Sequence, residues 1–102
     1  IPWRDKVMSE AFEYLKKTIE ILKNRGKVYL VKLPVDVRIG EIDTRLLPNF
    51  DEKIDKLAKS AAVPYLNLMN SDTKFTFTDG IHLYKDSAKD VSAEVGKWIS
   101  KQ

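Results

Sequence analysis

The feature that most constrains the fold is a short, nearly continuous apolar run, Val28 to Leu33, which directly follows a long amphipathic segment. The run is rich in β-branched residues, as is typical of a strand buried on both faces of a parallel sheet. Pro34 ends it. This run therefore predicts a parallel sheet that is covered by helices.

Three segments have the periodicity of amphipathic helices: about Trp3 to Arg25, about Glu52 to Ala62 and about Asp86 to Ser100. Gly26 can end the first helix in the left-handed conformation. A second strand is expected at Pro64 to Met69. The predicted buried positions of the first helix are Val7, Met8, Ala11, Phe12, Leu15, Ile19 and Leu22.

The segment Val35 to Phe50 has no sustained period and contains Gly40 and Pro48, so we expect a long surface loop, a kind of segment that is often functional. The alternation of helices and strands predicts a parallel sheet with helices on both faces. Two strands are few, because sheets usually have about four to six. The chain either dimerises through its sheet or is the C-terminal part of a larger doubly wound domain; the start at Ile1 favours processing from a longer polypeptide.

The length of 102 residues, with 43% hydrophobic and 32% charged residues, fits one small globular domain. The net charge of +3 is spread over isolated lysines, so no nucleic-acid partner is expected. There is no cysteine, which excludes disulfides and cysteine-based metal sites and leaves the compartment undetermined. No apolar run approaches the roughly 20 residues that span a bilayer, so no membrane segment is expected.

The candidate catalytic residues are Asp79 and His82, which lie in the stretch Phe77 to Leu83 with Gly80 between them. A carboxylate can hold an imidazole in one tautomer, and the ring can then remove a proton from a hydroxyl. The stretch follows the second predicted strand and precedes the last helix. It should therefore lie at the carboxyl ends of the strands, where open parallel sheets bind their ligands.

This stretch has two other interpretations. A lone histidine beside an Asp-Gly turn is often a surface or capping residue. Asp72, Asp79 and His82 could also be imagined as metal ligands, but their spacing is irregular and there is no second histidine, which makes a poor zinc site. We therefore expect no metal and no cofactor.

From about Val28 onward, the chain resembles the SGNH (GDSL-like) hydrolases. In that family an Asp-x-x-His motif precedes the last helix, as the stretch Phe77 to Leu83 precedes the helix containing Ser87 to Ser92. The segments Leu33 to Val35 and Pro64 to Leu68 are also similar to the alanine-export and alginate-acetylation branch of the superfamily.

The resemblance implies an α/β fold, a flavodoxin-like three-layer sandwich with a parallel sheet. Residues 1–102 would be a single α/β unit that forms its C-terminal half only. The resemblance further implies that Asp79 orients His82, and that His82 is the general base for a serine that attacks an ester or thioester carbonyl. The substrate would be an ester or acyl group on a small molecule or glycan.

The chain departs from the family in one important respect. The Gly-Asp-Ser motif that carries the nucleophile is absent, and the Gly and Asn of the oxyanion hole are not identifiable. We therefore expect residues 1–102 to be inactive alone and to pair with their own N-terminal half in an esterase or O-acyltransferase. The alternative is a non-catalytic α/β binding or assembly module that forms a homodimer through its sheet.

Overall fold

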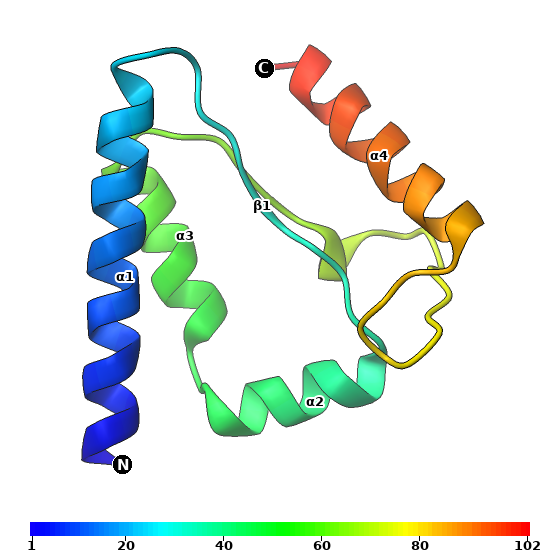
Figure 1. The fold of residues 1–102 in the computed structure, drawn as a ribbon, viewed down its shortest axis with the longest axis horizontal. Coiled ribbons are helices and arrows are strands. Elements are labelled where there is room, and N and C mark those ends of the chain that lie inside the picture. Colours follow the sequence, from blue (N-terminus) through cyan, green and yellow to red (C-terminus); the bar gives the residue numbers. More distant parts are fainter.

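The computed structural model describes all residues 1–102 and contains four helices and two short strands (Figure 1). In chain order these are α1 (Pro2–Lys23), β1 (Leu30–Lys32), α2 (Val37–Leu46), α3 (Phe50–Ser60), β2 (Tyr65–Asn67), the 3-10 turn η1 (Leu68–Asn70) and α4 (Lys85–Ser100). None of the helices combines the length and apolar character that crossing a membrane requires.

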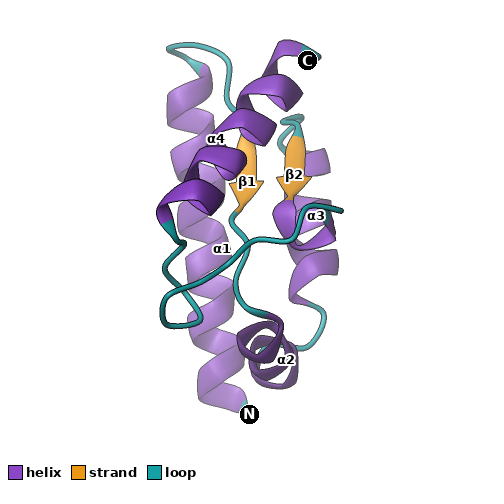
Figure 2. Ribbon diagram, turned by 90° about the vertical axis from the view of Figure 1, so that its right-hand side faces the viewer, coloured by secondary structure: helices purple, strands orange, loops and turns teal.

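The two strands run parallel, with Leu30 opposite Tyr65 and Lys32 opposite Asn67. Helices α1 and α3 lie on one side of this pair and α4 on the other, while α2 lies beyond the carboxyl ends of both strands (Figure 2). The connection from β1 to β2 runs through α2 and α3, as a parallel pairing requires.

The prediction of a flavodoxin-like three-layer sandwich is wrong. Helices account for 61% of the residues, and the sheet has only two strands of three residues each. The apolar runs Val28 to Leu33 and Pro64 to Met69 are longer than the segments that pair. One reason lies in Asn67, whose Oδ1 accepts a hydrogen bond from the amide of Met69 at 3.0 Å and thereby turns the chain into η1.

The expected loop from Val35 to Phe50 is also wrong, because most of it forms α2. The side chain of Asp36 begins this helix by accepting a hydrogen bond from the amide of Arg38 at 2.9 Å. A glycine inside a helix is usually unfavourable, but Gly40 lies against Met69, and a Cβ there would be 2.9 Å from Met69 Cε. The sulfur of Met69 also accepts a hydrogen bond from the amide of Val35 at 3.2 Å.

The predictions of α1, α3 and α4 are confirmed, with bounds that differ by a few residues. The main core lies where α1 and α3 meet the sheet, and its buried members are Ile19, Leu57, Ala58 and Val63. On the other side, Trp98 of α4 contacts Tyr29 edge to face, with ring centroids 5.8 Å apart.

The predicted buried face of α1 is only partly correct. Met8 and Ile19 are buried and Phe12 and Leu15 are half-buried, whereas Val7, Ala11 and Leu22 are exposed. A sheet of two strands offers too little apolar surface to cover the whole predicted stripe of a helix of 22 residues. Much of the apolar surface of α1 therefore faces solvent.

Candidate functional site

The stretch Phe77 to Leu83 forms a closed loop that lies against the start of α2. Phe77 and Leu83 make an isolated antiparallel bridge, and the amide of Thr78 donates a hydrogen bond to the carbonyl of His82 at 2.7 Å. The carbonyl of Gly80 accepts a hydrogen bond from the amide of Asp36 at 2.9 Å. These bonds hold the loop beyond the carboxyl ends of the strands, as the sequence predicted.

Gly80 permits this close approach. Its φ is +88°, a conformation that favours glycine, and a Cβ there would lie 3.0 Å from Cγ1 of Ile39 in α2. Any larger residue would both strain the backbone and push the loop away from α2. The glycine between the two candidate catalytic residues is thus required by the local geometry.

Asp79 and His82 are in direct contact. Oδ2 of Asp79 lies 2.6 Å from Nδ1 of His82. The second carboxylate oxygen, Oδ1, accepts hydrogen bonds from the amides of Ile81 at 3.1 Å and His82 at 2.8 Å. The carboxylate is therefore fixed by the backbone of its own loop and holds the imidazole by Nδ1.

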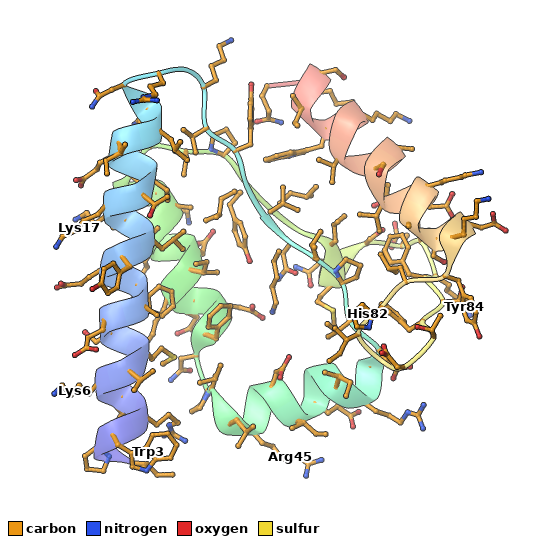
Figure 3. All side chains as sticks on the ribbon, viewed as in Figure 1. Trp3, Lys6, Lys17, Arg45, His82 and Tyr84 are labelled. Carbon is orange, nitrogen blue, oxygen red and sulfur yellow. The ribbon has the colours of Figure 1, made fainter.

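The charge of Asp79 is stabilised by the same contacts. Hydrogen bonds from the His82 amide, then from the His82 ring and the Ile81 amide, lower the pKa of Asp79 to about 2. The side chain of His82 is 77% exposed, and its Nε2 makes no hydrogen bond within the chain (Figure 3). An ionised carboxylate thus orients a ring whose other nitrogen faces outward.

No serine or threonine hydroxyl of the chain contacts the His82 ring. The hydroxyl of Thr78 donates its hydrogen bond to the backbone carbonyl of His82 rather than to the ring. Ser71 is bonded to Glu94, and Ser87 is buried and bonded to Thr76. The structure brings together the two predicted residues and adds no nucleophile to them.

Ser87 has a supporting role that sequence analysis did not identify. Its buried Oγ accepts a hydrogen bond from the amide of Thr76 at 2.8 Å and lies 3.0 Å from the hydroxyl of Thr76. These bonds join the first turn of α4 to the segment that leads into the loop. A serine at a helix start is common, so its position alone did not distinguish it.

A groove lies along α2 and does not include this loop. It has a volume of about 840 Å³ and is lined by α2, the start of α3, the end of β1 and Met69, whereas neither Asp79 nor His82 lines it. Lys32 lies in its wall, where Nζ is 2.7 Å from Oδ1 of Asp51 and 5.3 Å from the centre of the Phe50 ring. Sequence analysis missed this groove because it depends on α2, which was predicted as a loop.

The His, Asp and Glu side chains form no cluster of three or more that could hold a metal ion. The fold and the loop thus define a small, mainly helical unit that presents an exposed Asp–His pair. No family model, curated protein or solved structure matches the chain.

Proposed function

We propose that Asp79 and His82 form the base-supplying half of a serine esterase or O-acyltransferase site of the SGNH type. The supporting observation is the 2.6 Å contact between Asp79 Oδ2 and His82 Nδ1, with Nε2 left open. The serine would come from a polypeptide segment outside residues 1–102. The substrate would be an ester or acyl group on a small molecule or glycan.

In this mechanism Asp79 accepts a hydrogen bond from Nδ1–H of His82, which leaves the lone pair of the ring on Nε2. Nε2 removes the proton of the serine hydroxyl as its oxygen attacks the acyl carbonyl. The imidazolium, stabilised by Asp79, then returns the proton to the leaving group. Nε2 then removes a proton from water or from a second hydroxyl as its oxygen attacks the acyl-serine, and the proton passes to the serine oxygen as the acyl–serine bond breaks. Attack by water gives hydrolysis, and attack by a second hydroxyl gives transfer.

The geometry favours this role over that of a simple capping residue. A capping aspartate needs only the bonds from backbone amides, which Oδ1 already accepts. Oδ2 is separately engaged with Nδ1 of His82, so the orientation of the ring is fixed as well. A segment that carried the serine would also cover the exposed ring and exclude water from it.

An activity-based probe tests the proposal. A fluorophosphonate, which labels activated serines, should not label residues 1–102 alone, but should label the longest form of the polypeptide that its host cell produces. His82→Ala should reduce labelling of that form by about a thousandfold or more, because the serine loses its base. Thr78→Val, which removes the neighbouring hydroxyl and leaves the ring in place, is the control. Labelling that survives His82→Ala contradicts the proposal.

The second candidate function is a non-catalytic assembly module. It is favoured by the open outer edges of β1 and β2, since each strand pairs only with the other, and by the many large apolar side chains at the surface. In this case His82→Ala would leave the function of the parent protein unchanged. The probe experiment therefore separates the two candidates.

A further inference from the structure

The surface of this chain is larger than that of a self-sufficient domain. A folded monomeric protein of 11.7 kDa exposes about 5,900 Å². This chain exposes 7669 Å². The excess of about 1,800 Å² exceeds the roughly 800 Å² per partner that a stable interface buries. A surface of this size is sufficient for a stable contact with another protein molecule.

Helix α1 contributes the most regular part of this surface. Trp3, Val7, Tyr14 and Ile21 are all more than half exposed and follow one another at steps of four and seven residues. With about 3.6 residues per turn, these steps place all four on one side of the helix. We call these residues the α1 stripe. The stripe is separate from the side of α1 that carries the buried Met8 and Ile19.

The α1 stripe is flanked by charges of opposite sign. They would face each other if two copies of α1 lay side by side in antiparallel orientation. Glu10 and Lys17 are exposed beside the stripe, on either side of Tyr14 along the helix. The Lys6 and Lys17 side chains point away from the sheet (Figure 3).

In Figure 2, α1 lies on the β1 side of the strand pair, so the open edge of β1 is on the same side of the molecule as α1.

We propose that the α1 stripe is a homodimer interface in which α1 packs antiparallel against α1 of a second copy. A two-fold axis near Tyr14 places Val7 beside the partner's Ile21 and Glu10 beside the partner's Lys17. A parallel pairing would instead place Glu10 against the partner's Glu10, and like charges in such positions are destabilising. The inference does not depend on catalysis by Asp79 and His82.

Sedimentation equilibrium over a dilution series tests the interface. The unmodified chain should reach twice its mass of 11.7 kDa. Tyr14→Lys places two positive charges against each other at the axis and should weaken the dimer by about tenfold or more. Ser9→Lys makes a similar change on the opposite side of the helix and should leave the dimer unchanged. A monomer at all concentrations, or equal effects of both variants, overturns the proposal.

The antiparallel direction has its own test. Glu10→Lys and Lys17→Glu should each weaken the dimer by about tenfold, because each creates two like-charge contacts. The double variant restores opposite charges and should recover most of the affinity. Circular dichroism confirms that each variant keeps its helices.

Cysteine cross-linking gives a second measure of the direction, because the natural chain has no cysteine. A mixture of Val7→Cys and Ile21→Cys chains should form the mixed disulfide, whereas Val7→Cys alone should not cross-link. The reverse result would establish a parallel dimer and overturn the proposed arrangement.

Discussion

At the scale of the residue, the Asp79 carboxylate is stabilised by its own backbone as well as by histidine. Its pKa is lowered from 3.8 to about 2, and the first cause is the hydrogen bond from the His82 amide. Since the pKa is depressed in the folded chain, the carboxylate stabilises the loop above about pH 4. This stabilisation is lost as the pH falls through about 2.

An NMR titration of the Asp79 carboxyl carbon should therefore give a midpoint near 2. In His82→Ala the ring is absent, but the amides of residues 81 and 82 remain. The pKa of Asp79 should then rise and still stay below 3.8, because the main cause is retained. A midpoint at or above 3.8 in this variant would show that the ring alone lowers the pKa.

Gly80→Ala tests the fit between the loop and α2. The alanine would have to adopt a φ of +88° with its Cβ 3.0 Å from Ile39, so we expect destabilisation of about 1–3 kcal/mol. Gly96→Ala in α4 is the matched control, because a Cβ at residue 96 would have no neighbouring atom within 4 Å. Since alanine is the better helix former, this substitution should raise the free energy of unfolding by about 0.5–1 kcal/mol. Urea unfolding of both variants measures the difference. Equal effects would contradict the strain at residue 80.

At the scale of the element, the buried hydroxyl of Ser87 joins α4 to the segment that leads into the Asp79–His82 loop. Ser87→Ala leaves the amide of Thr76 without its acceptor, and we expect a loss of about 1–3 kcal/mol in the free energy of unfolding. Ser92→Ala, on the exposed side of the same helix, should change this free energy by less than about 0.5 kcal/mol. If Ser92→Ala costs as much, the loss in Ser87→Ala cannot be assigned to the Thr76 contact.

The helices with a sustained apolar period could be predicted from the sequence, because that period reports the buried face of an element. Helix α2 could not be, because Gly40 and Pro48 indicate a loop and the fit of Gly40 against Met69 is a tertiary contact. The pairing of Asp79 with His82 was predictable because the two residues are three apart in one turn. The groove beside α2 was not, since it is built from distant segments.

At the scale of the whole molecule, the sheet is too small to bury the apolar surface of the helices. Only 10 of the 102 residues are buried, so we expect a single copy to have a low free energy of unfolding and further burial in a dimer to raise it. The melting temperature should accordingly rise with protein concentration. For Tyr14→Lys the same rise should require a concentration about tenfold higher or more. A concentration-independent melting temperature for the unmodified chain would argue that the isolated copy is the stable unit.

Met69 joins η1 to the start of α2, and we expect this contact to be sensitive to oxidants. Its sulfur accepts the Val35 amide, and its methyl group lies against Gly40. Conversion of the thioether to a sulfoxide would add a polar oxygen where α2 and the strand ends meet. Mild peroxide should therefore loosen α2, seen as faster hydrogen exchange there, while Met69→Leu should protect the exchange rate from peroxide. Oxidation of this one sulfur atom would thus disrupt the groove along α2 and leave the Asp79–His82 pair in place.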